Sequence, residues 1–439
     1  MTQSRVEELI NDLLIRFPKG FDLSLTRITR LLEALGNPHL RLPPVIHIAG
    51  TNGKGSAAAN CRALLESAGY SAHVHTSPHL VYWNERYRLG KKGGGSFVDD
   101  KTLADALQRV TAPNNNQPIT VFEILTAVAF LLFAEHPADA VILEVGLGGR
   151  FDATNVIPKP AVSLIMPIAL DHTAFLGDTV EKIAFEKAGI IKHGAPVVIG
   201  KQESDSALDV LADIAAKKHT PCKIFGQDYQ GYEDHGRMVF QNEDGLKDLP
   251  LPKLSGDHQI ANSAAAIEAV LTAGFTLTDE AIANAMHALS WPARMQKITH
   301  GRIVDQLPKS LTVFLDGGHN PAGAQVIANE LRHWQQKGVP PIIMITGMIN
   351  TKDSVGYFSA FKGLVEKVYT VPVLSSENGV PAETLCDMAK AAGLTAEVMA
   401  NIDAALHHVA TTTPHQTVLI GGSLYLAGEF LQQNSTPPQ

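Results

Sequence analysis

The chain has few cysteines and no long apolar run. Its 439 residues include three cysteines, which lie far apart and form no C-x-x-C pair. This usage favours a reducing compartment and argues against a thiolate metal site. The N-terminus is charged, and no apolar run reaches the roughly 18 residues that a membrane-spanning helix needs. We therefore expect a cytoplasmic protein that is neither secreted nor inserted in a membrane.

Positive charge is also scarce. The chain has 36 Lys and Arg residues against 44 Asp and Glu residues, a net charge of -8. This balance argues against a nucleic-acid-binding surface, although a pocket can be locally cationic and still attract an anionic substrate. Hydrophobic residues make up 45% and charged residues 18%, which is typical of chains with sizeable cores and little disorder. The length indicates two or three domains.

A glycine-rich turn follows the first apolar stretch of the chain. The residues at 44–49 predict a short strand, and an alanine-rich helix over 57–68 follows the turn. Between them the sequence reads Gly-Thr-Asn-Gly-Lys-Gly-Ser at 50–56. Glycines let backbone amides close around phosphate oxygens, and a helix N-terminus adds partial positive charge. In such a phosphate cradle, Lys54 would neutralise the β- and γ-phosphates and the Ser56 hydroxyl would ligate Mg²⁺.

The spacing of this turn departs from the strict phosphate-loop pattern, in which lysine is followed directly by serine or threonine. Here Gly55 stands between Lys54 and Ser56. The alternative is an ordinary strand-to-helix turn with a surface lysine. We favour the nucleotide site, because strand, turn and helix follow one another in the order that the mechanism needs.

Strands and helices alternate through most of the chain, which predicts a mostly parallel sheet covered on both faces. In the first part we expect helices over 6–14, 22–36, 122–133, 179–191 and 262–273, strands over 72–75, 140–145, 161–168 and 196–199, a hairpin or loop over 90–95, and a small antiparallel excursion over 222–251.

A second alternation begins after a proline-containing linker near 291–299. It predicts strands over 311–315, 342–346, 367–372, 396–399 and 417–420, and helices over 322–335, 354–364, 382–391, 402–410 and 424–431. We therefore expect an α/β protein with a P-loop-type, doubly wound, mostly parallel sheet domain (1–295), followed by a smaller Rossmann-like α/β domain (296–439). The tail from 432 to 439 is expected to be disordered.

Two strand ends of the first domain carry side chains that suit a metal. Glu144 ends a buried strand and would complete a Mg²⁺ shell with Ser56 or Ser77, unless it is a strand-end acid that faces solvent. His172 follows another strand of the same sheet, and a neutral imidazole can ligate a metal. The alternative for His172 is a buried histidine that bonds to the backbone.

The second domain has its own candidate ligand edge in Asp-Gly-Gly-His-Asn-Pro at 316–321. Asp316 could hold a ribose hydroxyl and His319 could reach a terminal phosphate, while Asn320 before a proline also predicts a plain helix start. Arg294 could bridge the two domains onto a phosphate, or it could be structural. Lys187 is predicted from the residues alone to be a solvated lysine.

Taken in order, these segments resemble the folylpolyglutamate synthase / dihydrofolate synthase family of the Mur-ligase superfamily. The resemblance covers nearly the whole chain and is carried by GTNGKGS at 50–56, SPHL at 77–80, FEIL at 122–125, EVGLGGRFDATN at 144–155, LDHT at 170–173, EKAGI at 186–190, DGGHNP at 316–321, GM at 347–348 with KD at 352–353, and GSLY at 422–425. The sequence departs from the family at Gly317 and Gly318, where alanine is frequent, and at Ala293 and Met295, where glycine and phenylalanine flank the arginine.

The resemblance implies an ATP-binding central domain with a folate or pterin site, followed by a C-terminal ligase domain. It implies ATP contacts at Asn52, Gly53, Lys54, Gly55, Ser56, Asn262, Arg294 and Asp316, and Mg²⁺ ligands at Ser77, Glu144 and His172, with K⁺ as a further cation. It implies that Lys187 is modified to a carbamate, and catalytic roles are then expected for Lys54, His172, Lys187 and His319. Pterin-substrate contacts are implied at Asp22, Leu23, Ser24, Leu25, Phe122, Glu123, Ile124, Leu125, Phe151, Asp152 and Ala153.

The implied reaction is the ATP-dependent addition of L-glutamate to dihydropteroate, to the glutamate tail of a folate, or to both, through an acyl phosphate. The expected partners are these small molecules, and the expected state is a monomer. A Mur-type ligase that acts on a nucleotide-linked muramyl peptide is a sibling alternative, which 77–80 and 122–125 disfavour. Another alternative is a nucleotide-driven switch that hydrolyses ATP without an amino acid. Phosphate release that depends on glutamate would distinguish a ligase from such a switch. A nicotinamide site in the second domain is disfavoured, because no strand there is followed by G-x-G-x-x-G.

Overall fold

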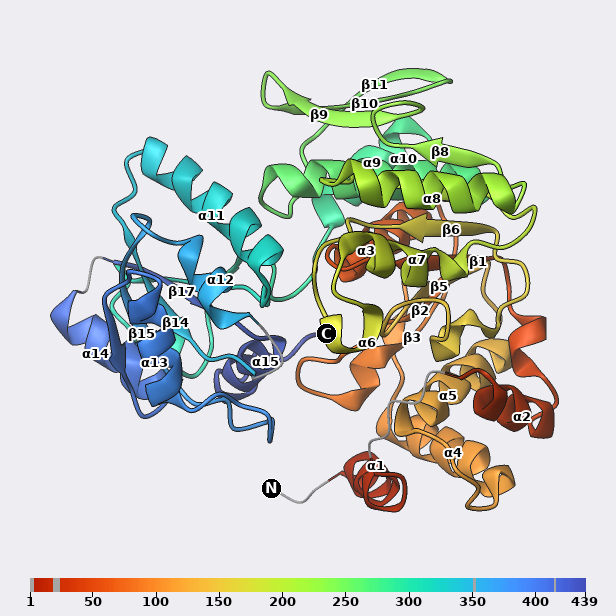
Figure 1. Ribbon diagram of the computed structural model, residues 1–439, viewed down its shortest axis with the longest axis horizontal. Coiled ribbons are helices and arrows are strands. Elements are labelled where there is room, and N and C mark those ends of the chain that lie inside the picture. The colour runs from red at the N-terminus through yellow and green to blue at the C-terminus, as the bar shows by residue number, and fades with distance from the viewer. Residues whose placement is uncertain (1–3, 19–23, 350–352, 414–415) are drawn as a thin grey trace.

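Two sheets, each flanked by helices, organise the chain (Figure 1). The computed structural model describes residues 4–18, 24–349, 353–413 and 416–439. The larger sheet and its helices come from the first two thirds of the chain, and the smaller sheet from the remainder. The predicted fold class, a doubly wound parallel-sheet domain followed by a smaller α/β domain, is confirmed.

The larger sheet has eight strands. Its order is β4 (Ser96–Phe97), β3 (Tyr87–Leu89), β2 (Ala72–His75), β5 (Ala140–Glu144), β1 (Val45–Ala49), β6 (Val162–Ile165), β7 (Val197–Ile199) and β8 (Cys222–Ile224). Six neighbouring strands run parallel, in the order β2, β5, β1, β6, β7 and β8. At one edge of the sheet, β3 and β4 form an antiparallel hairpin, and β3 pairs antiparallel with β2. The chain crosses from one side of β1 to the other between β5 and β6, so the crevice beyond β1 is the expected ligand edge of this sheet.

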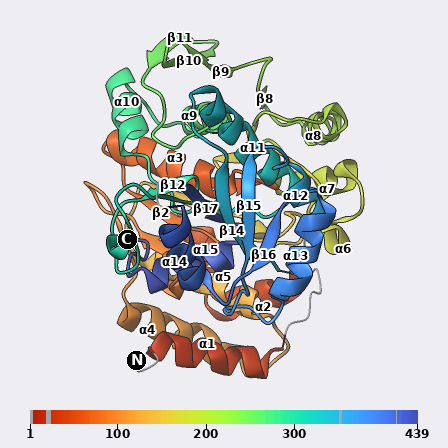
Figure 2. The same cartoon turned by 90° about the vertical axis from the view of Figure 1, so that its left-hand side faces the viewer.

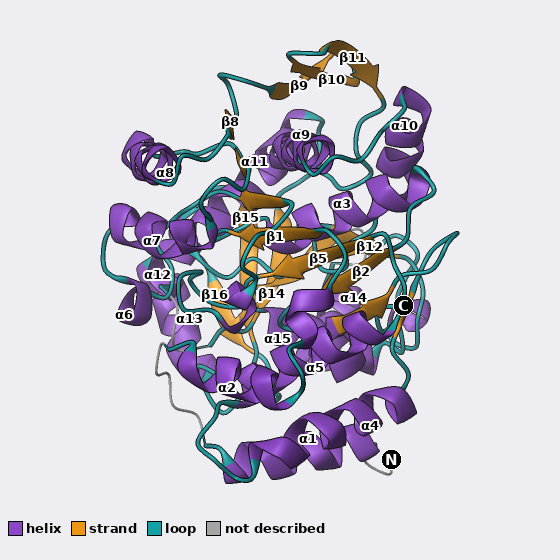
Figure 3. Ribbon diagram, turned by 90° about the vertical axis from the view of Figure 1, so that its right-hand side faces the viewer, coloured by secondary structure: helices purple, strands orange, loops and turns teal. Residues whose placement is uncertain are grey.

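Helices cover both faces of this sheet, as expected when successive strand residues alternate between faces. The helices are α1 (Arg5–Arg16), α2 (Thr26–Ala34), α3 (Lys54–Ser67), α4 (Asp100–Thr111), α5 (Val121–Glu135), α6 (Thr173–Leu176), α7 (Val180–Lys187), α8 (Asp205–Lys217), α9 (Asp257–Thr272) and α10 (Asp279–Ala288). Ile46 and Ile48 of β1 belong to the core beneath α3, α9 and α10, whereas Val45 and Ala49 belong to the opposite cores beneath α5 and α7. Figure 3 shows these helices around the central strands.

A small antiparallel sheet of β9 (Gln230–Asp234), β10 (Arg237–Asn242) and β11 (Gly245–Leu249) rises at the top of Figure 1. Met238 and Phe240 of β10 share a core with Ala264 of α9, so this sheet rests on the helix layer. The predicted excursion is confirmed, except that its first residues form β8 and extend the large parallel sheet.

The smaller sheet has the order β12 (Gln296–Ile298), β13 (Thr312–Leu315), β17 (Thr417–Gly421), β14 (Ile342–Thr346), β15 (Val365–Thr370) and β16 (Ala396–Val398). All neighbours pair in parallel except β12, which runs antiparallel to β13. The helices are α11 (Pro321–Gln336), α12 (Ser354–Ser359), α13 (Ala382–Ala391), α14 (Ile402–Thr412) and α15 (Leu424–Gln433). The first three share one core and the last two the other, so both faces are covered (Figure 2).

The C-terminal tail differs from the prediction of disorder. Asn434 is fully buried, and its side chain accepts from the amides of Ile303 and Val304 and donates to the carbonyl of His300. The residues after it border the cavity described below. The predicted helix over 354–364 is also too long, because the chain turns at Phe361 and enters β15 at Val365. No helix in the described ranges is both long and apolar enough to cross a bilayer.

Candidate active site

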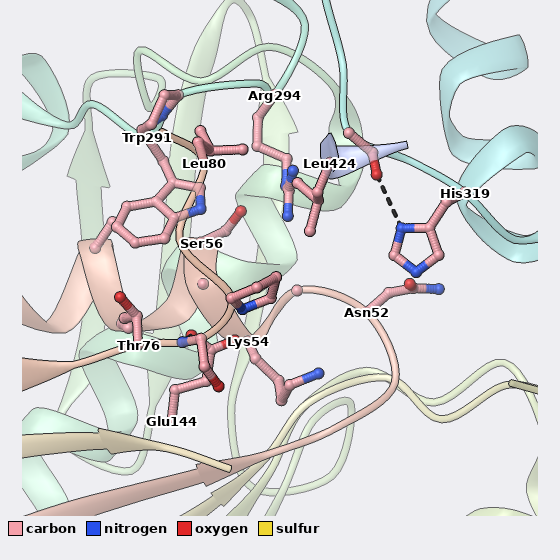
Figure 4. Close-up of a pocket in the computed structure, with 18 of the residues that line it drawn as sticks. Asn52, Lys54, Ser56, Thr76, Leu80, Glu144, Trp291, Arg294, His319 and Leu424 are labelled. Carbon is pink, nitrogen blue, oxygen red and sulfur yellow. Dashed lines mark hydrogen bonds between the residues drawn. The ribbon is translucent and has the colours of Figure 1, made fainter. Parts of the chain in front are cut away.

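A large cavity lies between the two sheets, with a volume of about 1430 Å³. Its walls include the turn after β1, the carboxyl end of β5, the segment after β6, the linker before β12 and the turn after β13. Figure 4 shows Trp291, Arg294 and His319 on one side of this space, with Lys54 and Glu144 on the other. The carboxyl edges of both sheets therefore face one cavity, as expected for doubly wound folds.

The glycine-rich turn forms the start of α3, which begins at Lys54, three residues earlier than predicted. Gly53 is the N-cap residue, and its φ of 83° lies in the left-handed region that favours glycine. At Gly55, a Cβ atom would lie 2.7 Å from Nε1 of Trp291, so the linker approaches the helix start too closely for a larger residue. This arrangement leaves the first backbone amides of the helix at the cavity, where they suit a phosphate group.

Two lysines meet at one carbonyl oxygen of this turn. Nζ of Lys54 donates to the Gly50 oxygen at 3.0 Å, and Nζ of Lys187, at the end of α7, donates to the same oxygen at 2.8 Å. Lys187 is 5% exposed, so the prediction of a solvated lysine is wrong. Burial, assisted by the charge of Lys54, lowers the pKa of Lys187 to about 7. A large share of this amine is therefore neutral near physiological pH, which gives it a nucleophilic lone pair.

Ser77 and Glu144 lie together beside the cradle. The Ser77 amide donates to Oε2 of Glu144 at 3.3 Å, and the Ser77 hydroxyl is buried without a hydrogen-bond partner among the described residues. Burial raises the pKa of the Glu144 carboxyl, with Lys54 the largest opposing influence. A buried hydroxyl without a partner, beside a buried carboxylate, fits the oxygen ligands of a hard divalent cation.

His172 also borders the cavity, but its side chain is 41% exposed. Its backbone has a φ of 51°, and Nε2 lies 3.9 Å from Oδ1 of Asp171. Across the described ranges, no cluster of three or more His, Cys, Asp or Glu side chains is arranged to hold a metal. A role for His172 as a third metal ligand therefore stays a prediction.

Buried polar side chains of α9 support the cradle from behind. Nε2 of Gln259 donates to the Ser56 hydroxyl at 3.5 Å, and Nδ2 of Asn262 donates to Oε1 of Gln259 at 3.2 Å. A Cβ atom on Gly53 would lie 3.1 Å from Oδ1 of Asn262. Asn262 is thus at the cradle, as predicted, and Gln259 is an additional residue of this cluster. Gln259 and Asn262 are three residues apart, so they lie on the same face of α9, and this spacing could have identified Gln259 from the sequence.

Asp316 fixes the linker between the two sheets. Its Oδ2 accepts from the Met295 amide at 2.8 Å and its Oδ1 from the Gly318 amide at 2.7 Å. Burial raises the pKa of this carboxyl, and Arg294 is the largest influence in the opposite direction. Arg294 lines the cavity, with Nη1 bonded to the carbonyl of Ala293 at 2.7 Å. Both predicted residues therefore lie at the cavity and also hold the linker in place.

The start of α11 reaches across the cavity to the first sheet. Nδ2 of Asn320 donates to Oδ2 of Asp171 at 3.0 Å and to Oδ1 of Asn52 at 3.2 Å, while Oδ1 of Asn320 caps α11 by accepting from the Gly323 amide. His319 lies beside this bridge, with Nε2 at 3.6 Å from Asp171 and Nδ1 bonded to the carbonyl of Gly317 at 2.9 Å (Figure 4). The predicted helix start at Asn320 is confirmed, and the residue also links the two sheets.

The cavity wall also includes aromatic and aliphatic side chains. Most of the residues predicted to contact a pterin lie in its wall, namely Ser24, Phe122, Glu123, Leu125, Phe151, Asp152 and Ala153. Ile124 is fully buried in the core instead, Leu25 packs against that core, and Asp22 and Leu23 lie outside the described residues. The structure does not place Ile124 in the cavity wall, because consecutive helix residues point in different directions and the Ile124 side chain lies in the core.

Two acidic side chains, Glu123 and Asp152, also belong to the cavity wall. Both oxygens of Asp152 are occupied by the amides of Gly146, Leu147 and Thr154, so this residue holds the loop after β5. Glu123 bonds to Arg27 at 3.0 Å through Oε2, while its Oε1 is buried without a hydrogen-bond partner among the described residues. Such an enclosed acceptor suits a ligand that donates hydrogen bonds.

Two family descriptions match the chain. One, the Mur ligase middle domain, matches residues 48–270, and the other, the Mur ligase, glutamate ligase domain, matches residues 293–424. The folylpolyglutamate synthase of Lacticaseibacillus casei is 34% identical over 423 residues, which cover 92% of this chain and 93% of that protein. This chain belongs to the folylpolyglutamate synthase / dihydrofolate synthase family of the Mur ligases.

Solved structures agree with this membership. E. coli FolC in complex with DHPP and ADP has a TM-score of 0.86 and 28% sequence identity, covering 98% of this chain and 97% of that one. A bifunctional folylpolyglutamate synthase/dihydrofolate synthase with Mn, AMPPNP and L-glutamate bound has a TM-score of 0.84 and 28% identity, covering 98% of this chain and 99% of that one. The chain is accordingly an ATP-dependent ligase of folate metabolism, as the resemblance of its motifs to this family implied.

Two of the positions where this ligase departs from the family pattern, Gly317 and Gly318, lie directly after Asp316. Gly317 and Gly318 leave Asp316 bonded at both oxygens, and a Cβ atom on Gly317 would lie 2.3 Å from Cδ2 of Leu424. Glycine at 317 therefore leaves room for the Leu424 side chain at the start of α15.

Proposed function

We propose that this ligase adds L-glutamate to dihydropteroate, to the glutamate tail of a reduced folate, or to both. The observation that carries the proposal is one cavity lined by two kinds of side chain. Its lining includes Lys54, Lys187 and the start of α3, and it also includes the aromatic rings of Phe122 and Phe151. The lysines and the helix start suit the phosphates of ATP, and the aromatic rings suit a planar ring system.

The chemistry follows from the weakness of a carboxylate as an acyl donor. A carboxylate oxygen of the acceptor attacks the γ-phosphorus of ATP, the bond to the β,γ-bridging oxygen breaks, and ADP leaves. The amine of L-glutamate then attacks the acyl carbon of the acyl phosphate, loses a proton, and releases phosphate. Lys54 and the amides of the cradle would neutralise the charge that builds on the phosphates, and His319 is our candidate for the γ-phosphate.

Ser77 and Glu144 would hold a divalent cation, with His172 as the predicted third ligand. Both oxygens fit this role, since the Ser77 hydroxyl has no hydrogen-bond partner among the described residues and Glu144 is buried beside it. A bound Mg²⁺ would screen the negative charge of the phosphates. A site for K⁺ stays a prediction.

Lys187 would carry a carbamate, formed when its neutral amine attacks CO₂ and loses a proton. Burial and a pKa lowered to about 7 support this role, because only the unprotonated amine reacts. The carbamate would place a negative charge beside Lys54. Lys54 would then be attracted to its neighbour rather than repelled by it.

We assign ATP contacts to Asn52, Gly53, Lys54, Gly55, Ser56, Asn262, Arg294 and Asp316, and acceptor contacts to the cavity-lining members of the predicted pterin set. We place the domain boundary at 295/296, so that β12 begins the second domain and the linker residues around Arg294 close over ATP. Enclosure by two domains would exclude water from the reactive acyl phosphate. A monomer that acts in the cytoplasm stays a prediction.

The test offers purified protein ATP, Mg²⁺ and L-glutamate with dihydropteroate or tetrahydrofolate as separate acceptors. We expect ADP release that requires both glutamate and an acceptor, with the glutamylated product identified by mass spectrometry. ATP hydrolysis without glutamate and without an acceptor would indicate a nucleotide-driven switch. If no product forms with dihydropteroate or with tetrahydrofolate, the folate assignment fails.

A further inference from the structure

His47 is a fully buried histidine on β1, the strand that leads into the ATP cradle. Because strand residues alternate between faces, its ring points away from the core that Ile46 and Ile48 share. Nε2 of the ring lies 2.8 Å from the hydroxyl oxygen of Thr154, which is 107 residues away in the chain. Nδ1 is buried without a hydrogen-bond partner among the described residues. An apolar residue would fill this place in the sheet as well, so packing alone does not explain the histidine.

The hydroxyl of Thr154 joins His47 to Asp152. It bonds to Oδ1 of Asp152 at 2.6 Å, and the two oxygens of this carboxyl also accept from the amides of Gly146, Leu147 and Thr154. A carboxyl group that accepts from three amides is held in its ionised form, so the hydroxyl donates its one hydrogen to Asp152. The oxygen of Thr154 then accepts from His47, which places the ring hydrogen on Nε2. The three side chains form one relay, from His47 through Thr154 to Asp152.

The direction of this relay does not change near neutral pH. Burial, with the charge of Lys192 adding to it, lowers the pKa of His47 to about 3, so the ring is neutral and keeps one hydrogen. Burial raises the pKa of the Asp152 carboxyl, and the hydrogen bond from the Thr154 hydroxyl is the largest influence in the opposite direction. The relay therefore favours the charged form of Asp152, which is the form that holds the three amides.

The relay ends at the loop after β5, which borders the cavity. Asp152 is 4% exposed and belongs to the cavity wall. The loop that it holds is tightly enclosed: a Cβ atom on Gly146 would collide with the ring of Phe122, and one on Gly149 would lie 2.8 Å from the carbonyl oxygen of Lys187. Because neither contact leaves spare room, a shift of this loop would displace Phe122 or the end of α7. The bonds of Asp152 thus fix a part of the wall that we assign to the acceptor substrate.

We propose that His47 is a positioning residue for the acceptor substrate, because through Thr154 it holds Asp152 and the loop after β5 in the geometry that binds this substrate. His47 is not among the described residues that line the cavity, so it acts through the other two members of the relay. Its strand continues into the ATP cradle, so the relay also ties the acceptor loop to the element that binds ATP. The inference rests on the proposed ligase function, since it concerns the acceptor of that reaction.

The test compares His47→Leu and His47→Gln with the wild type in steady-state assays, with whichever of dihydropteroate and tetrahydrofolate the wild type glutamylates. Leucine removes the donor, whereas glutamine keeps an N–H group at a similar reach. We expect the KM for the acceptor substrate to rise by about 5- to 20-fold in His47→Leu, from the loss of one buried hydrogen bond, and by less than about threefold in His47→Gln. The KM for ATP should change by less than about twofold in both variants.

Thr154→Val removes the middle of the relay while keeping the shape of the side chain, and it serves as the test variant if His47→Leu does not fold. It should raise the KM for the acceptor substrate at least as much as His47→Leu does. The double variant should be no worse than Thr154→Val alone, because both substitutions break the same bond. Two independent packing defects would instead multiply their effects.

His73→Leu is the matched control. His73 is also fully buried, on β2 of the same sheet, and its ring bonds to the carbonyl of His136 and the amide of Gly90. This variant should lose stability without a change in the KM for the acceptor substrate. Backbone amide hydrogen exchange in the same proteins gives a readout that needs no turnover. The amides that Asp152 holds should exchange faster in His47→Leu than in the wild type, and at the wild-type rate in His73→Leu.

An unchanged KM for the acceptor substrate in His47→Leu, whatever happens to kcat, would overturn the proposal. An equal rise in His73→Leu, or an equal rise in the KM for ATP, would overturn it as well and leave the relay with a role in stability alone. If the wild type itself shows no glutamate-dependent turnover, the proposed function fails, and this outcome is visible before any variant is compared. Amide exchange then still decides whether the relay holds the loop, and exchange that His47→Leu leaves unchanged would show that it does not.

Discussion

The lowered pKa of Lys187 predicts a pH-dependent stability that a single substitution should remove. Lys187→Met keeps the length and apolar stem of the side chain but cannot be protonated. In the unfolded chain the amine has a pKa of 10.5, and in the folded protein burial lowers the pKa to about 7. Folding therefore releases a proton between these values, and the stability that depends on the neutral amine is full above 10.5 and lost as the pH falls towards 7.

The magnitude follows from the shift. Each pKa unit corresponds to about 1.4 kcal/mol, so between pH 10 and pH 6 the wild type should lose about 4 kcal/mol of unfolding free energy relative to Lys187→Met. At pH 6 the variant should be the more stable protein, even though it loses the hydrogen bond to Gly50. As the pH rises towards 10, the stability advantage of Lys187→Met should shrink, and the wild type should then become the more stable protein.

The assay is urea-induced unfolding at pH values from 6 to 10 in CO₂-free buffer, which keeps the amine unmodified. Lys182→Met is the matched control, since Lys182 lies on the same helix with its side chain 62% exposed and should show no such trend. If the difference in unfolding free energy between the wild type and Lys187→Met does not change with pH, the reasoning is refuted. A stability advantage of the variant that increases as the pH rises would also refute it.

Three further predictions concern other contacts. Asn320→Ser should keep the α11 cap, whereas Asn320→Ala should lose about 1 kcal/mol of stability, yet both should lower kcat/KM by about tenfold because both remove the amide that bridges to Asp171. Asn434→Ala should lower the urea-measured unfolding free energy by about 3 kcal/mol, because it leaves buried backbone groups without partners, while Gln433→Ala should change little. Gly55→Ala should raise the KM for ATP by at least about tenfold, and Trp291→Ala should partly restore it by removing the clash.

The strands that position the site could be predicted because buried parallel strands are short apolar runs. β1, β5 and β6 all appear where the apolar runs lie, and residues that follow each of these strands line the cavity. α8 was not predicted, although Ser204 caps it and apolar residues recur along one face at Ala207, Leu211 and Ala215. That signal was in the sequence.

Other features depend on contacts between distant residues, which periodicity does not report. Lys187 has the spacing of an ordinary helix lysine, and only its approach to Gly50, 137 residues away in the chain, shows that it is buried. The tail is polar in composition, but Asn434 fits a turn 131 residues earlier and is held there.

The central claim is that the cavity activates an acid by phosphorylation and delivers it to an amine. The most direct measurement uses dihydropteroate or folate whose reacting carboxylate is labelled with ¹⁸O, together with ATP, Mg²⁺ and L-glutamate. Because the acceptor oxygen becomes the bridge of the acyl phosphate and leaves with the phosphorus, one labelled oxygen should appear in the released phosphate per amide bond formed. Phosphate without the label, alongside normal product formation, would contradict the account.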